Sequence, residues 1–169
     1  MKLNYRLRNE LRYAKHPFVS IGGISFVVFS LISLWIGGNP RPVLLLLNKP
    51  PRALEQLLFF ILWLSSSLFC GFLFGALFLT ENRCTQLIST QSALLIIISR
   101  LFSFVSYPLF CTCNAWLLSL TSLLLALCFC AASILTLYRI FRIGTYILIV
   151  HFALLSWAIL RVATIIFMN

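Results

Sequence analysis

Three basic side chains interrupt the apolar stretches of this sequence, and they are the residues there that could do chemistry. Arg100 follows ALLIIIS, His151 lies in YILIVHFALL, and Arg161 lies in AILRVATIIF. An ionisable group at the centre of a bilayer costs about 2.5–3.5 kcal/mol on insertion scales. Either arginine could avoid this cost by extending its side chain to an interface. His151 could ligate a haem iron or relay a proton, or simply donate to a neighbouring carbonyl.

The residue types that most enzymes need are scarce. Glu10, Glu55 and Glu81 are the only acids, and their spacing offers no carboxylate pair for hydrolysis or for a divalent metal. No Gly-rich phosphate loop, HExxH or nucleophile elbow is present. The six cysteines lack the C-x-x-C spacing of a redox or zinc site, which favours their acting as small hydrophobes. We therefore expect no catalysis by this chain alone, no metal site and no tightly bound cofactor.

The composition indicates an all-α, polytopic integral membrane protein. Of 169 residues, 62% are hydrophobic and 9% charged, against about 25% charged in soluble domains. At roughly 20 apolar residues per span, the chain forms a single membrane domain and has no room for a soluble one. We predict five spans, at about 18–37, 57–79, 92–111, 115–137 and 144–167. The VLLLL string between the first two spans is too short to cross, and we expect it to lie in the interface or to re-enter.

Basic residues give the expected orientation. Leu3, Leu7 and Leu11 recur at helical spacing in residues 1–17, which predicts an amphipathic interfacial helix. The short loops carry an excess of Lys and Arg on one side, which favours a cytoplasmic or matrix-side N-terminus. That side holds Lys2, Arg6, Arg8, Arg12, Lys15, Arg83, Arg139 and Arg142, and the other holds Arg41, Lys49 and Arg52. The net charge of +10 thus suits anionic lipid headgroups rather than nucleic acid.

One set of short strings resembles CcmB, the permease subunit of the cytochrome c maturation haem exporter, of the ABC-2 membrane-domain class. The likeness covers most of the chain but needs gaps. The matching residues are Glu10, Leu11 and Arg12 in the N-terminal elbow helix, Ile36 and Gly37 ending the first span, Ile61, Leu62 and Trp63 in the second, and Leu77, Phe78 and Glu81 before a polar turn. The family's second acidic residue and glycine of that turn are replaced by NRCTQL, and its sixth span is absent.

This resemblance implies a transporter subunit that hydrolyses nothing itself. Thr80, Glu81, Arg83 and Leu87 would form a coupling turn that contacts a separate soluble ATPase. Other haem-delivery membrane proteins would be partners, a homodimer is possible, and haem would be a handled or transported ligand. The membrane would be a bacterial or mitochondrial inner membrane.

A second set of residues resembles the five-span TspO/translocator family in one ungapped register. It comprises LNKP at 47–50, then Phe59, Trp63 and Gly71, with Tyr138, Tyr146 and Asn169 fitting the last helix. This likeness implies a receptor for tetrapyrroles or sterols, with a pocket inside the bundle. Several family positions differ, and here hold Leu54, Glu55, Leu57, Ser103, Ser106, Val150 and His151. A third interpretation is a small structural subunit of a larger membrane complex.

Overall fold

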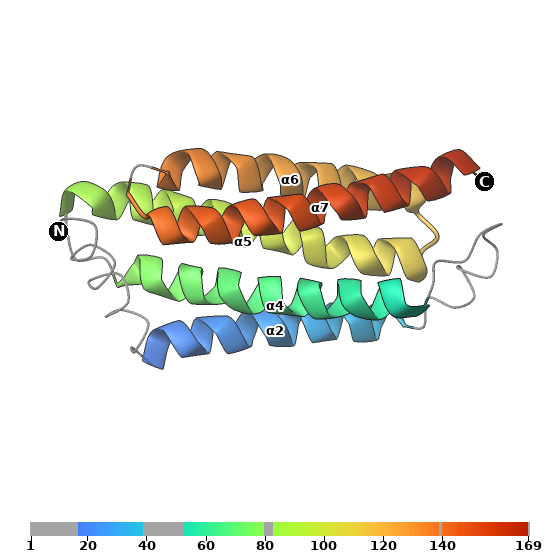
Figure 1. Cartoon of the computed structure of the whole chain (residues 1–169), viewed down its shortest axis with the longest axis horizontal. Coiled ribbons are helices and arrows are strands. Elements are labelled where there is room, and N and C mark those ends of the chain that lie inside the picture. Colours follow the sequence, from blue (N-terminus) through green and yellow to red (C-terminus); the bar gives the residue numbers. More distant parts are fainter. Residues whose placement is uncertain (1–16, 39–52, 80–82, 139, 169) are drawn as a thin grey trace.

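The computed structural model describes residues 17–38, 53–79, 83–138 and 140–168, and within them the chain is helical with no strand. Five helices follow one another (Figure 1), with α2 and α4 lying together beside the group α5, α6 and α7. Their bounds are α2 Pro17–Gly37, α4 Ala53–Phe78, α5 Arg83–Cys111, α6 Trp116–Leu137 and α7 Arg142–Met168. Each of the five is long and apolar enough to cross a membrane, which confirms the predicted all-α, polytopic membrane fold.

The largest difference from the expected spans is at the start of α5. This helix begins at Arg83, nine residues before the predicted 92, because hydropathy marks where the bilayer begins and not where the helix begins. The first turns, RCTQLIST, are polar yet helical. Arg83 and Leu87 therefore belong to a helix, and the expected turn from Thr80 to Leu87 is shorter than predicted. Thr80 and Glu81 lie outside the described residues, as do the predicted N-terminal helix with Glu10, Leu11 and Arg12, and the VLLLL string.

The bundle exposes large apolar side chains and buries polar ones, which is the reverse of a soluble protein. Large apolar side chains face outward, among them Trp35, Leu135 and Phe167, which are 83%, 78% and 87% exposed. The buried polar residues are mostly serines, and most of their hydroxyls pair with other helices or with their own backbone. Such a molecule satisfies most of its polar groups internally and presents hydrocarbon to lipid. The chain is an integral membrane protein.

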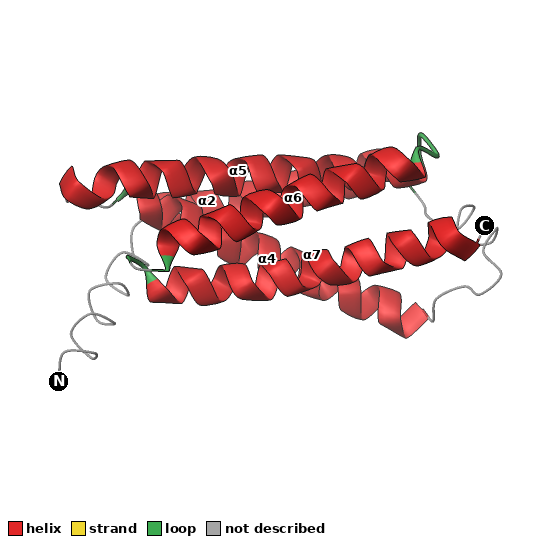
Figure 2. Cartoon of the chain, turned by 90° about the horizontal axis from the view of Figure 1, so that it is seen from above, coloured by secondary structure: helices red, strands yellow, loops and turns green. Residues whose placement is uncertain are grey.

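The helices form a closed ring in the order α2, α4, α7, α6, α5, and α4 also contacts α5 across the interior. Figure 2 shows the same bundle turned by 90°. Helices α2 and α4 approach closely, because glycines take the place of larger residues at their contact. A Cβ on Gly71 would lie 2.4 Å from the carbonyl oxygen of Gly22, and one on Gly75 would lie 2.7 Å from Cα of Val19. The G-x-x-x-G of Gly71 and Gly75 thus lets two backbones touch.

Serine hydroxyls join α5 to its neighbours. Ser99 donates to the carbonyl oxygen of Ala126 at 2.7 Å, and Ser122 donates back from α6 to that of Phe102 at 2.6 Å. On the other side of α5, Ser33 of α2 donates to the carbonyl oxygen of Phe104. That carbonyl lacks its helical partner because the residue four positions on is Pro108, which has no N–H. One serine therefore satisfies a backbone group that a proline leaves open.

Candidate functional site

Arg100 lies in the interior of the bundle. It is near the middle of the 26-residue apolar part of α5, Gln86–Cys111, roughly 17 Å of helix from the nearer end at about 1.5 Å per residue. The side chain is 1% exposed and points across the bundle to α4. The idea that it extends to an interface is wrong, because hydroxyls within hydrogen-bonding range are available inside.

Two adjacent serines of α4 receive the guanidinium. Nη1 of Arg100 donates to Oγ of Ser67 at 3.3 Å, and Nη2 donates to Oγ of Ser66 at the same distance. Ser67 in turn donates to the carbonyl oxygen of Trp63 at 2.9 Å, and Ser30 of α2 donates to Ser67 at 2.8 Å. The arginine is thus fixed by neutral hydroxyl groups, which accept its hydrogen bonds without neutralising its charge.

His151 of α7 shares the hydroxyl of Ser66. Nδ1 of His151 lies 3.0 Å from Oγ of Ser66, and the imidazole is 1% exposed. The expected bond from His151 to a backbone carbonyl is wrong, since a side-chain hydroxyl takes its place. Ser66 consequently links the guanidinium on α5 to the imidazole on α7.

Counting protons in this chain favours one tautomer of His151. A guanidinium can only donate, so Oγ of Ser66 accepts from Arg100. Ser66 makes no other hydrogen bond within the described part of the chain than those to Arg100 and His151. Donation to Nδ1 of His151 is therefore the arrangement that leaves its own proton paired. The neutral imidazole then carries its proton on Nε2. This protonation leaves Nε2 a hydrogen-bond donor, not a lone pair directed at an iron.

Two donors at this centre have no acceptor among the described residues. They are Nε of Arg100 and Nε2 of His151. The described side chains also include no Asp or Glu, because Glu10, Glu55 and Glu81 all lie outside them. Leaving a charged donor unpaired inside a protein is expensive. The arrangement therefore has one positive charge and two nitrogens without any hydrogen-bond partner, and the described side chains provide no anion for them.

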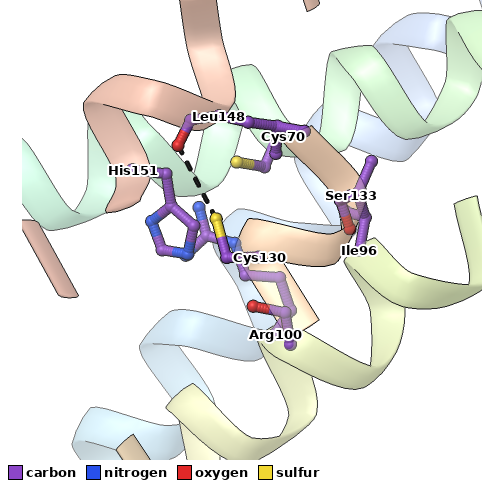
Figure 3. Close-up of a pocket in the computed structure, with 8 residues that line it drawn as sticks. Cys70, Ile96, Arg100, Cys130, Ser133, Leu148 and His151 are labelled. Atoms are coloured by element: carbon purple, nitrogen blue, oxygen red, sulfur yellow. Dashed lines mark hydrogen bonds between the residues drawn. The ribbon is translucent and has the colours of Figure 1, made fainter. Parts of the chain in front are cut away.

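The two basic groups border a small gap between α4, α5, α6 and α7. Figure 3 shows the guanidinium and the imidazole beside each other, with Sγ of Cys130 next to them. Cys130 Sγ lies 3.6 Å from the carbonyl oxygen of Leu148. The gap is lined by Cys70, Ile96, Ser99, Arg100, Cys130, Ser133, Leu148 and His151, and it has no room for a water molecule. Access for any ligand therefore requires helices to separate.

An aromatic surface lies beside this centre, where α4 meets α7. The ring of Trp63 packs edge-on against His151 with centroids 6.2 Å apart. Phe59 lies 5.5 Å from Trp63 and 4.9 Å from Trp157. All three rings are half-buried, so each also faces outward. This seam is where a flat apolar molecule would find ring faces next to a positive charge.

The remaining residues from the sequence lie elsewhere. Arg161 is exposed near the end of α7, with its guanidinium carbon 5.6 Å from the centroid of Trp157, a cation–π contact. Leu87 is 69% exposed on the first turns of α5. Ser103 and Ser106 are buried, and Ser106 donates to the carbonyl oxygen of Ser103 at 2.7 Å.

The sequence indicated Arg100 and His151 but not the serines that connect them. The available signal was the run of three serines at 65–67 within an otherwise apolar helix, LLFFILWLSSSLF. Its meaning depends on which helix faces it. Chemically, Ser66 and His151 have the spacing of a nucleophile and its base. However, Arg100 donates to the same oxygen and so withdraws electron density from it, which favours binding over attack.

Comparison with protein-family models, with curated proteins and with solved structures finds no match to this chain. The function therefore has to be argued from the site itself. Within the described ranges, no group of three His, Cys, Asp or Glu side chains is placed to hold a metal ion.

Proposed function

We propose that this protein is a membrane-embedded binding protein for a flat, acidic ligand of the tetrapyrrole class, as its resemblance to the TspO/translocator family implies. The observation that carries the proposal is the contact of Trp63 with His151, 6.2 Å between ring centroids. Trp63 matches the pattern of that family, whereas His151 stands at a family position where the residue differs. The two residues are 88 positions apart in the sequence. Their meeting beside a buried cation gives an aromatic surface and a polar centre in one place.

The chemistry of the seam fits such a ligand. A tetrapyrrole has a large apolar face, which packs well on Phe59, Trp63 and Trp157. These rings are half-buried between α4 and α7, so the macrocycle would approach from the hydrocarbon side. Separation of α7 from α4 would then open the way to the gap beside Arg100. Haem and its metal-free precursors are the natural candidates.

Fluorescence of the purified protein tests this proposal. Protein in lipid nanodiscs is titrated with metal-free protoporphyrin IX, and we expect saturable quenching of tryptophan emission. Replacement of Trp63 by Ala should weaken binding by about tenfold, since a buried aromatic contact contributes roughly 0.5–1.5 kcal/mol beyond its area. Trp35→Ala is the matched control, because Trp35 is 83% exposed on α2. Absence of saturable binding, or equal losses in both variants, would reject the function.

A second function, the transporter subunit implied by the CcmB resemblance, is supported by the connections of the helices. The antiparallel helices α2 and α4 start at Pro17 and end at Phe78 respectively, so residues 1–16 and 80–82 join the same end of the bundle. An elbow helix and a coupling turn have to share one membrane face if a soluble ATPase is to contact both. We place that face on the cytoplasmic or matrix side of an inner membrane, as the basic residues favour.

Co-purification separates the two functions. Affinity purification in mild detergent should bring an ATPase with the transporter subunit, and Glu81→Ala with Arg83→Ala should abolish that association. A protein that binds porphyrin alone and brings no ATPase fits the first function only. If it does neither, the interpretation as a structural subunit is the one that stands.

A further inference from the structure

Arg100 and His151 form a positively charged centre inside the bundle, and its unpaired nitrogens suit one class of chemical group. Arg100 is fixed by two neutral hydroxyls, at 3.3 Å each, and its Nε has no acceptor in the part of the chain that the structure describes. The same is true of Nε2 of His151. Both side chains are 1% exposed and border the same gap. Two unpaired nitrogens and a charge with no anion among the described side chains thus lie together beside a gap too small for a water molecule.

We propose that this pair is a carboxylate-binding site, which Arg100 and His151 form for an acidic arm of the ligand. The inference rests on the proposed tetrapyrrole-binding function and names the group that the interior recognises. A carboxylate has a single negative charge and two oxygens. One oxygen accepts from Nε–H of Arg100 and the other from Nε2–H of His151. Charge-assisted bonds of this kind are roughly twice as strong as neutral ones.

Other occupants match the centre less well. A water molecule is neutral and would leave the charge uncompensated. A phosphate has a charge of about −1.5 to −2 at pH 7, which the single positive charge of this centre would leave partly uncompensated. Iron on Nε2 would require that nitrogen to lose the proton that the bond from Ser66 leaves there. A monovalent carboxylate satisfies both donors and the charge.

The geometry of the seam connects this site to the aromatic surface. Ser67 donates to the carbonyl oxygen of Trp63, one turn earlier in α4. The hydroxyls that hold Arg100 therefore lie one helical turn from the aromatic residue. Trp63 also touches His151. A macrocycle on Phe59 and Trp63 would have its edge at the imidazole, and an acidic arm on that edge would extend inward to Arg100.

The test compares metal-free protoporphyrin IX with its dimethyl ester, which has the same ring without the negative charges. In nanodiscs, the wild-type protein should bind the diacid at least about tenfold more tightly than the ester, the ratio expected from one or two charge-assisted hydrogen bonds. Arg100→Gln should bring this ratio close to one by weakening diacid binding while leaving ester binding unchanged. Arg142→Gln is the control: it removes the same charge at the exposed start of α7, and the ratio should stay as in wild type.

Each result decides a separate point. Equal binding of diacid and ester by wild type overturns the carboxylate site while leaving the tetrapyrrole-binding function intact. If the wild type and Arg100→Gln have the same ratio of diacid to ester affinity, the role of Arg100 is overturned. Retained ester binding shows that a variant is folded. If Arg100→Gln cannot be purified, Arg100→Lys keeps the charge but lacks Nε, and a ratio that does not fall below that of wild type overturns the site. If the wild-type protein binds neither the diacid nor the ester, the proposed function is rejected and this site with it.

Discussion

The hydroxyl of Ser66 lies 3.0 Å from Nδ1 of His151, and this contact joins the second membrane helix to the fifth at the centre of the bundle. The same oxygen accepts from Nη2 of Arg100. One small side chain therefore sets the position of both basic groups and directs the proton of the imidazole to Nε2. The properties of the site depend on this connection, and they can be tested by single substitutions.

Ser66→Ala should destabilise the ligand-free protein. The substitution removes the acceptor of a charged donor and the partner of His151, and an unsatisfied buried group costs about 1–3 kcal/mol. Thermal unfolding in detergent measures the effect. Ser65→Ala, at the half-buried neighbouring position, should change the midpoint much less. Equal midpoints for the two variants would show that the connection contributes nothing to stability.

Arg100→Met should have the opposite effect and stabilise the ligand-free protein. The apolar side chain fills similar space without an uncompensated charge, and exchanges of buried ionic groups for apolar ones are often stabilising by about 1–4 kcal/mol. Ser66 and Ser67 keep their remaining partners, His151 and the carbonyl of Trp63. The same thermal assay applies. A large loss of stability would mean that the arginine is structural, and that its charge is already compensated.

Gly71→Ala should be much more damaging than Gly144→Ala. At Gly71 the added Cβ meets backbone, 2.4 Å from the carbonyl oxygen of Gly22 and 2.7 Å from Cα of Gly23. At Gly144 it meets the ends of side chains, Cδ1 of Phe141 at 2.4 Å and Cδ1 of Leu73 at 2.5 Å, which can rotate away. Overpacking costs about 1–3 kcal/mol, and we expect the upper end at Gly71. Similar midpoints for the two variants would contradict the close contact of α2 with α4.

Ser33 and Pro108 should be energetically coupled. Ser33→Ala removes the only donor that the described residues direct at the carbonyl of Phe104 from another helix. In a Pro108→Ala background, the restored N–H at position 108 can make the ordinary helical bond to that carbonyl. Ser33→Ala should then cost less, with a coupling energy of about 0.5–3 kcal/mol in a double-mutant cycle. Additive effects would show that serine and proline act independently.

Cysteine labelling should report which surfaces lipid covers. Cys113 and Cys128 are both exposed in the isolated chain, but Cys113 follows the end of α5 whereas Cys128 lies within α6. In single-cysteine variants in membranes, a charged maleimide should label Cys113 from one side only and should leave Cys128 unlabelled. A membrane-permeant maleimide should reach both. Labelling of Cys128 by the charged reagent would contradict its position against hydrocarbon.

The number and type of helices could be predicted from the sequence, because five apolar stretches of sufficient length have few alternatives in a bilayer. The start of α5 could not, since RCTQLIST is helical without being apolar. Arg100 and His151 could be recognised as unusual from position alone. Their contacts could not be predicted, because Ser66 is 34 residues from Arg100 and 85 from His151, and only the packing of α4, α5 and α7 brings the three together.

The backbone contact of Gly22 with Gly71 has a consequence for how the molecule can move. Where two main chains touch, no side chain can reorient to allow movement, so the two helices cannot slide past one another there without losing that contact. We therefore expect the first and second helices to move as one rigid unit. The serine-to-carbonyl hydrogen bonds between α5 and α6 join those two helices in the same way. Opening between α4 and α7 would move the last helix away from α4. His151 lies on α7, so its imidazole would move with that helix, whereas Arg100 would stay with α5.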